Sequence, residues 1–351
     1  MANFITPIKN SYFFVLLFLL TAISGCSHNP INVTTGYVLE GIVENESLEF
    51  VFAQDDPDTG CHLGQSFDYF LGSVNVMTDS NNKYLPMIPL LSSYCSEYKA
   101  REAELRSIRA LNNRNIAEAK DARALQQYWL AKTAERRLKA FNVGMKVFDY
   151  QTGNNEWNCP VFDESKEEAS FMLSLVMGSL AIKNDAESGM VVGVPRNIAS
   201  IILEAADCLD NRRWGGAPQA LQASLWILLP DKKPANIKKS NWEILEYANR
   251  SGVRVGNRLG SALHGVAAEI AGDKEQQLNA LAIYKRSLGN PVFEGNDYRL
   301  VDQVATRAMR DLSNIIWTTE VGYRTPFGQL GTLPPTLQES TDDSEDLDSL
   351  L

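Results

Sequence analysis

The feature that most constrains the fold is a repeated alternation of amphipathic helices with tight turns, clearest at residues 193–230. Apolar residues recur there at steps of three and four positions, which predicts a helix with a continuous apolar face. The pair Gly215-Gly216 permits a sharp reversal before a second apolar helix at residues 218–229. The stretch therefore predicts a helix, a tight turn and a second helix, whose apolar faces must be buried against neighbouring helices.

The same pattern extends along most of the chain, which has 351 residues, 44% of them hydrophobic. That content is ample for a continuous core. Few stretches have the pattern of a strand, and short segments rich in glycine or proline separate the apolar runs. We therefore predict an all-α domain at residues 46–330, built as an α-solenoid of helical hairpins. Besides the pair above, helices are expected at residues 63–77, 84–110, 114–150, 163–181, 242–249, 272–291 and 298–317.

The N-terminus carries a targeting signal. Lys9 precedes an apolar run at residues 12–22, which is long enough for the core of a signal peptide and short for a transmembrane helix. The run is followed by Ile-Ser-Gly-Cys, ending at Cys26, which resembles a bacterial lipobox, where a cysteine is acylated and the preceding residues are removed. We predict a signal peptide at residues 1–25 and a lipid-modified Cys26. The alternative is an ordinary signal peptide with an incidental cysteine.

The predicted lipid anchor sets the expected location. Several acyl chains together hold a protein stably on a membrane, and residues 26–45 would form the tether to the domain. In Gram-negative bacteria an aspartate after the lipidated cysteine usually retains a lipoprotein in the inner membrane, whereas Ser27 follows here. We therefore expect the chain to be anchored in the outer membrane and to face the periplasm.

Four further cysteines would lie in the oxidising periplasm: Cys61, Cys95, Cys159 and Cys208. They allow two disulfides in three connectivities, or buried free thiols. Neighbouring helical hairpins favour the pairs Cys61–Cys95 and Cys159–Cys208.

The charge of the chain argues against one class of partner. It carries 43 acidic and 33 basic residues, a formal net charge of −10, which disfavours nucleic-acid binding. Residues 331–351 contain an acidic run and are expected to form a disordered tail. Basic residues outnumber acidic ones at 99–139, where a helix could meet anionic lipid or an acidic partner. A solvated face with ion pairs between successive turns explains the same run.

Sequence motifs give little support for catalysis. The three histidines, His28, His62 and His264, belong to no metal-binding or catalytic motif. His62 lies beside Cys61, but a disulfide cysteine next to a surface histidine explains this pair better than half of a thiol site does. We predict a protein that is not an enzyme and that needs no metal and no cofactor.

Aromatic and arginine side chains are the candidate ligand-binding residues. An apolar groove between helices is a usual place for a small organic ligand, and Trp214, Trp226 and Trp242 lie on or beside predicted helices. Arg212 and Arg213 precede Trp214 at a turn, where they could hold a carboxylate through bidentate hydrogen bonds. The alternatives are tryptophans in the core and solvated arginines.

Two local patterns resemble tetratricopeptide repeats. The sequence GDKEQQLNALAIYKRSLGNP at 272–291 resembles a repeat helix with its terminating proline, and LEAADCLD at 203–210 resembles the end of a repeat. With the lipobox, an Asp-Asp-Pro start at 55–57, the GGAPQALQA turn and the helix YRLVDQVATRAMRDL, these patterns resemble the TRAP-transporter-associated T-component (TatT) family over residues 44–317.

The resemblance implies an all-α lipoprotein with degenerate tetratricopeptide-like hairpins. It further implies a homotrimer that cooperates with the periplasmic solute-binding protein of a TRAP transporter in handling small, apolar ligands. The long segment at 99–150 departs from the compact hairpins expected of the family. The expected function is a non-catalytic accessory of solute transport. Two other interpretations stay open: a scaffold that grips a peptide in envelope or outer-membrane assembly, and a hydrolase if an acidic pair converges in a cleft.

Overall fold

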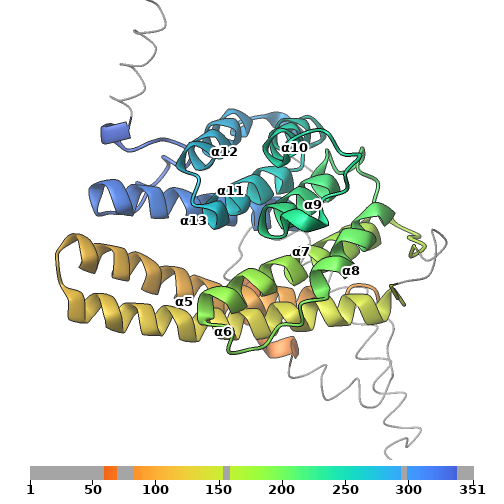
Figure 1. Ribbon diagram of the computed structural model, residues 1–351, viewed down its shortest axis with the longest axis horizontal. Coiled ribbons are helices and arrows are strands. Elements are labelled where there is room, and N and C mark those ends of the chain that lie inside the picture. Colours follow the sequence, from red (N-terminus) through yellow and green to blue (C-terminus); the bar gives the residue numbers. More distant parts are fainter. Residues whose placement is uncertain (1–58, 69–81, 153–158, 294–298, 338–351) are drawn as a thin grey trace, which may run out of the picture.

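Every regular element in the described part of the chain is a helix, so the predicted all-α fold is confirmed (Figure 1). Cys26, the predicted signal peptide and the predicted tether lie outside the described residues. Among the described helices, none is both long and apolar enough to cross a membrane. The computed structural model describes residues 59–68, 82–152, 159–293 and 299–337.

The helices form two groups, which we call the lower and upper layers after their places in Figure 1. The helices predicted from residue 84 onwards are present, with ends that differ by several residues. Residues 59–68 are helical and overlap the start of the helix predicted at 63–77, whose remaining residues lie outside the described part of the chain. The lower layer holds α5 (Met87–Asn112), α6 (Ile116–Val147) and α7 (Ser165–Ser188). After α8 (Ile198–Ala205), the upper layer holds α9 (Ala217–Leu228), α10 (Asn241–Val255), α11 (Leu259–Ala271), α12 (Lys274–Ser287) and α13 (Arg299–Val321).

A long hairpin of α5 and α6 forms the base of the lower layer (Figure 1). Helix α5 ends at Asn112, two residues beyond the predicted end at 110. Asn115 then caps α6, because its side-chain oxygen accepts a hydrogen bond from the Glu118 amide at 3.2 Å. Helix α7 packs along α6 and completes the layer.

In the upper layer α11 lies at the centre, in contact with α9, α10, α12 and α13. The predicted reversal before α9 is confirmed: Gly215 and Gly216 have φ angles of 60° and 91°, which glycine adopts without strain. A Cβ on Gly215 would also lie 2.7 Å from the Cα of Gly252 in α10. Helices α10 and α11 are also close at Gly260, where a Cβ would lie 2.6 Å from the Ala248 carbonyl oxygen.

The two layers share one continuous apolar core, and a smaller cluster lies between α12 and α13. The layers meet where α13 packs on α5 and α9 on α7. Helix lengths do not repeat along the chain: α5 and α6 have 26 and 32 residues, whereas α8 has 8 and α10 has 15. The predicted solenoid of repeats therefore stays a prediction.

Past α13 the described chain continues to residue 337 and packs back on the fold. Trp317 Nε1 donates a hydrogen bond to the Thr332 carbonyl at 2.9 Å, and Leu337 packs against the cluster between α12 and α13. The predicted start of the tail, at residue 331, therefore falls inside a packed segment. The rest of the predicted tail, residues 338–351, lies outside the described residues.

The four cysteines of the domain form the two pairs that neighbouring hairpins favour. The Cα atoms of Cys61 and Cys95 are 5.3 Å apart, and those of Cys159 and Cys208 are 5.2 Å apart. The first disulfide ties the helical segment at 59–68 to α5. The second ties the chain before α7 to the 3-10 turn that follows α8.

Replacing both Cys159 and Cys208 by alanine should lower the free energy of unfolding, because this disulfide closes a sequence separation of 49 residues. The loop-closure entropy of such a crosslink corresponds to about 4 kcal/mol. Urea denaturation followed by circular dichroism without reductant measures the loss. A variant with the midpoint of the wild type would contradict the prediction.

Gly178→Ala should destabilise the chain, because a Cβ there would lie 2.6 Å from the Phe141 ring of α6 and 3.0 Å from Ile202 of α8. We expect a loss of about 1–3 kcal/mol in urea denaturation, despite the better helix propensity of alanine. Gly265→Ala is the matched control inside α11, since its nearest contact would be the end of a flexible side chain at 3.0 Å. Equal losses in both variants would refute the role of the Phe141 contact.

Candidate functional site

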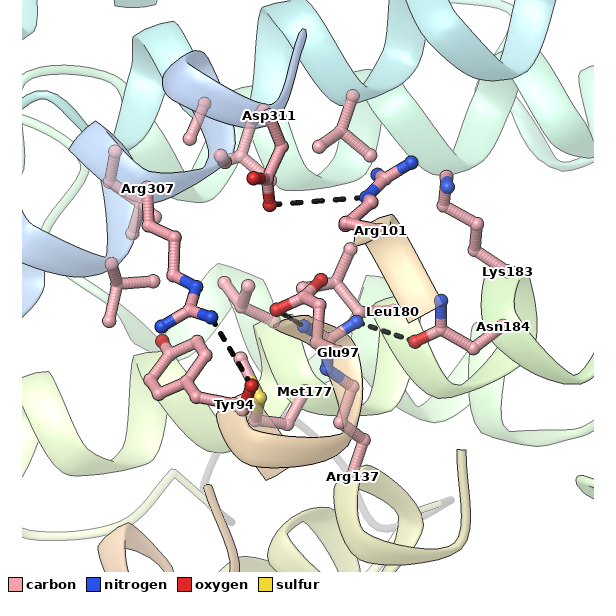
Figure 2. Close-up of a pocket in the computed structure, with 17 residues that line it drawn as sticks. Tyr94, Glu97, Arg101, Arg137, Met177, Leu180, Lys183, Asn184, Arg307 and Asp311 are labelled. Carbon is pink, nitrogen blue, oxygen red and sulfur yellow. Dashed lines mark hydrogen bonds and ion pairs between the residues drawn. The ribbon is translucent and has the colours of Figure 1, made fainter. Parts of the chain in front are cut away.

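A small cavity lies where α5, α6 and α7 of the lower layer meet α11 and α13 of the upper layer (Figure 2). The centres of water-sized molecules can occupy about 40 Å³ of it, which is room for roughly three waters or a molecule of a few non-hydrogen atoms. Apolar side chains of α7, α11 and α13 form part of the wall. The polar residues that line the cavity are Tyr94, Glu97, Arg101, Arg137, Lys183, Asn184, Arg307 and Asp311.

Arg137 is the most deeply buried charge of the cavity, with a side chain only 2% exposed. Its Nη2 lies 2.6 Å from Glu97 Oε2, and its Nη1 donates to Asn184 Oδ1 at 2.5 Å, so one guanidinium joins α5, α6 and α7. Burial alone would raise the pKa of Glu97, but Arg137, Arg101 and Arg307 outweigh it and lower that pKa. Glu97 is therefore ionised at neutral pH.

Glu269 of α11 connects the two layers. Arg101 of α5 donates to both of its carboxylate oxygens, at 3.0 and 3.1 Å, and Lys183 of α7 donates to Oε1 at 3.0 Å. Burial opposes ionisation of this carboxyl, yet Arg101 and Lys183 lower its pKa to about 2. The Glu269 carboxylate is thus a fixed negative charge held between two cations.

The pKa of Asp311, on α13, is shifted in the opposite direction from that of Glu269. Burial raises its pKa to about 7; Arg101 and Arg307 oppose this shift, while Glu97 and Glu269 add to it. Its Oδ2 lies 3.9 Å from Arg101 Nε, which is beyond hydrogen-bond distance. The Asp311 carboxyl therefore keeps its proton to a higher pH than an exposed aspartate does.

Tyr94 and Arg307 lie together on one side of the cavity, opposite Arg101 and Lys183 (Figure 2). Arg307 Nη2 donates to the Tyr94 carbonyl at 3.3 Å, and the Arg307 guanidinium carbon lies 5.3 Å from the Tyr94 ring centroid. The Tyr94 hydroxyl is buried and has no hydrogen-bond partner among the described residues. Burial raises the pKa of Tyr94, so the hydroxyl stays a donor.

Glu97 and Asp311 bring an acidic pair with opposite pKa shifts into one cavity, which is the arrangement that the hydrolase interpretation requires. Two features argue against acid–base work. Glu97 is held by Arg137 at 2.6 Å, and the space holds only a few atoms, less than a sugar ring or a peptide unit. The site suits the binding of a small polar molecule better than catalysis.

The five ligand-binding residues predicted from the sequence lie away from this cavity. Trp214 and Trp226 are buried in the core, at 2% and 3% exposure, and Trp242 is half-buried. Arg212 is exposed, and Arg213 Nη1 lies 2.6 Å from the buried Glu168 of α7. None of the five lines the cavity.

Sequence reasoning missed the cavity because its charges resembled a solvated helix face. Arg101 and Arg137 belong to the basic stretch at 99–139, yet their side chains are only 13% and 2% exposed. A usable signal was the position of each arginine within its own helix, because a charged residue that falls in step with the apolar residues of a helix faces the core. Their partners lie elsewhere in the chain: Glu269 follows Arg101 by 168 residues.

The structure also shows the surroundings of two of the three histidines, His62 and His264. Cys61, His62 and Cys95 bring their potential metal ligands within 4.8 Å of one another, but the two sulfurs are bonded to each other and are not thiolates. His264 is buried in α11, where its Nε2 lies 2.9 Å from Gln276 Oε1, and burial lowers its pKa. Neither histidine therefore has the surroundings of a metal ligand.

Comparison with known proteins identifies no relative: no protein-family model, no curated protein and no solved structure matches this chain. The class that the fold and site define is an all-α protein with a small polar cavity between two helical layers. The resemblance to the TatT family stays a prediction.

Asp311→Asn should remove a pH dependence of stability. Because the pKa of about 7 in the folded chain exceeds the ordinary value of 3.8, the Asp311 carboxyl contributes stability below about pH 4 that is lost as the pH rises through 7. We expect the variant to exceed the wild type by roughly 1–3 kcal/mol at pH 8 and by less at pH 5, measured by urea denaturation. Asp231→Asn, on an exposed turn, controls for net charge. Parallel pH curves for wild type and Asp311→Asn would contradict the raised pKa.

Proposed function

We propose that this chain is a lipid-anchored, periplasm-facing accessory of a TRAP-type solute transport system. It has no catalytic role; it binds a small ligand and docks on the periplasmic solute-binding protein. The observation that carries the ligand-binding part is the cavity at the junction of five helices, because it combines polar groups with apolar walls. The location and the partner rest on the lipobox at Cys26 and on the resemblance to the TatT family.

The position of the cavity supports an accessory role. A molecule bound there contacts α5, α6 and α7 of one layer and α11 and α13 of the other. A ligand that binds one arrangement of the two layers better than another shifts the population towards that arrangement. Occupancy of the cavity can therefore be transmitted to the outer surfaces of both layers, where a solute-binding protein would dock.

The peptide-gripping scaffold is the second candidate, and one observation favours it. Tyr98 of α5 and Tyr323, just after α13, are 50% and 52% exposed. Arg324 pairs with Glu102 at 2.8 Å, so these two segments are neighbours. Exposed aromatic side chains beside an arginine are typical of protein-binding surfaces.

The two candidates predict different states of the full-length lipoprotein extracted in detergent. As a transport accessory it should be a homotrimer by light scattering, carry a small molecule in native mass spectrometry, and bind the purified TRAP solute-binding protein of its own organism in biolayer interferometry. A ligand-free monomer that does not bind the solute-binding protein would contradict the proposal and favour the scaffold.

Ala308→Leu tests whether the cavity holds the co-purified molecule. Ala308 of α13 lines the cavity and is not fully buried, so a larger side chain fills the space at a moderate cost. We expect the small molecule to be lost from the native mass spectrum while the trimer persists. Ala308→Ser, which keeps the volume, should retain the molecule. Retention in both variants would place the ligand elsewhere.

A further inference from the structure

The turn between α5 and α6 lies at one end of the molecule, at the left edge of Figure 1. Seven consecutive residues there, 111–117, are all exposed. Two of them are large aliphatic residues, since Leu111 and Ile116 are 55% and 54% exposed. The Asn112 side-chain amide donates to the Thr318 carbonyl at 3.2 Å, so α13 supports the turn from one side while the two aliphatic residues face solvent.

Cations flank these aliphatic residues, and the nearby carboxylates do not neutralise them. The two acidic residues at the start of α6, Glu118 and Asp121, both pair with Arg106. Four other cations of this region form no ion pair within the described part of the chain: Arg109, Arg114, Lys120 and Arg123. This end of the molecule therefore has an excess of positive charge, although the whole chain has a formal net charge of −10.

Arg114 occupies a backbone position that does not favour arginine. Its φ angle is 58°, in the left-handed region that is strained for a residue with a Cβ and relaxed for glycine. Its amide donates to the Leu111 carbonyl at 2.9 Å, a turn contact that the backbone of glycine would also make. The Arg114 side chain is exposed and contacts no described partner, so the fold gives no reason for an arginine here. A strained residue of this kind points to a role in binding.

A protruding turn that carries aliphatic side chains among cations fits the surface of a lipid bilayer. The aliphatic groups can enter the boundary between headgroups and acyl chains, while arginine and lysine keep their charges at the level of the phosphates. Anionic headgroups attract clustered cations through the negative surface potential of the membrane. A protein partner would have to provide a hollow that matches the turn, whereas a fluid bilayer needs no preformed pocket.

We propose that the turn region at 109–123 rests on an anionic phospholipid surface, with Leu111 and Ile116 inserted and the four cations at the headgroups. The proposal takes the lipid anchor at Cys26 from the proposed function. Residues 27–58 would span at most about 100 Å, so the anchor alone leaves the orientation of the domain open. Because the anchor keeps the turn close to the bilayer, a weak second contact is enough to orient the domain.

The test uses the full-length lipoprotein in phosphatidylcholine vesicles that contain phosphatidylglycerol. A polarity-sensitive fluorophore is attached to the thiol of the Asn113→Cys variant, which is reactive because the cysteines of the domain form disulfides. We expect its emission to shift to the blue and to be quenched by lipids with brominated acyl chains, and to do so less in vesicles of phosphatidylcholine alone. The same fluorophore on Ala235→Cys, in the exposed segment between α9 and α10, is the control and should stay in water.

Further substitutions in the labelled chain separate the contact from folding. Leu111→Ser with Ile116→Ser should abolish the blue shift, whereas Leu288→Ser, at a leucine of the upper layer that is 42% exposed, should leave it. Arg114→Gly should be at least as stable as the wild type in urea denaturation, because glycine suits a φ of 58°. The lost charge should still lower the ratio of inserted to exposed fluorophore about fivefold. Lys238→Gln, an exposed charge elsewhere, should change neither measurement.

Three results would overturn the proposal: a fluorophore at residue 113 that stays in water while the lipoprotein is bound to the vesicles, an equal blue shift at residue 235, or a shift that Leu111→Ser with Ile116→Ser does not change. A lipoprotein that does not bind the vesicles at all would contradict both this contact and the anchor. Failure of the transport role is distinct, since a chain whose turn enters the bilayer but that does not bind the solute-binding protein would leave the membrane contact in place.

Discussion

The arrangement of the two layers depends on the bridge that Glu269 of α11 makes to Arg101 of α5 and Lys183 of α7. Taking three charges out of water is costly, and their mutual attraction offsets that cost only when the geometry is good and the hydrogen bonds are made. Here both carboxylate oxygens are engaged, at 3.0 and 3.1 Å from Arg101. Removing one member would leave a buried charge without its partner, so the bridge fixes how the layers meet even where its net contribution to stability is small.

The cavity is a consequence of that bridge. Apolar side chains pack closely because they interdigitate, whereas long charged side chains must keep the distances and angles of their ion pairs. Around Arg137 and Asp311 these requirements leave a space that neighbouring apolar residues of α7 and α11 do not fill. Because these charges are buried away from water, the electrostatic interactions among them are strong. This is why Glu269 and Asp311, in one cluster, have pKa values displaced in opposite directions.

The features that could be predicted from the sequence are those that depend on residues close together in the chain. Helix periodicity, the glycine pair at 215–216 and the break between the helices expected at 84–110 and 114–150 act through neighbouring residues, and all three were predicted correctly. The cysteine pairs followed from the adjacency of hairpins. The cavity could not be predicted, because it joins side chains as distant as Tyr94 and Arg307. Trp214 and Trp226 attracted attention as aromatic residues, but at helical spacing they form the core.

The position of the cavity between the two layers also bears on how much a bound ligand can stabilise one arrangement of them. A ligand that binds only one arrangement of the two layers stabilises it by RT ln(1 + [L]/Kd), about 2.7 kcal/mol at a hundredfold excess over Kd. The ion pairs of Glu269 with Arg101 and Lys183 already join the layers without a ligand. Binding in the cavity would therefore adjust an assembled fold and bias the outer surfaces of α5 and α13, rather than drive folding.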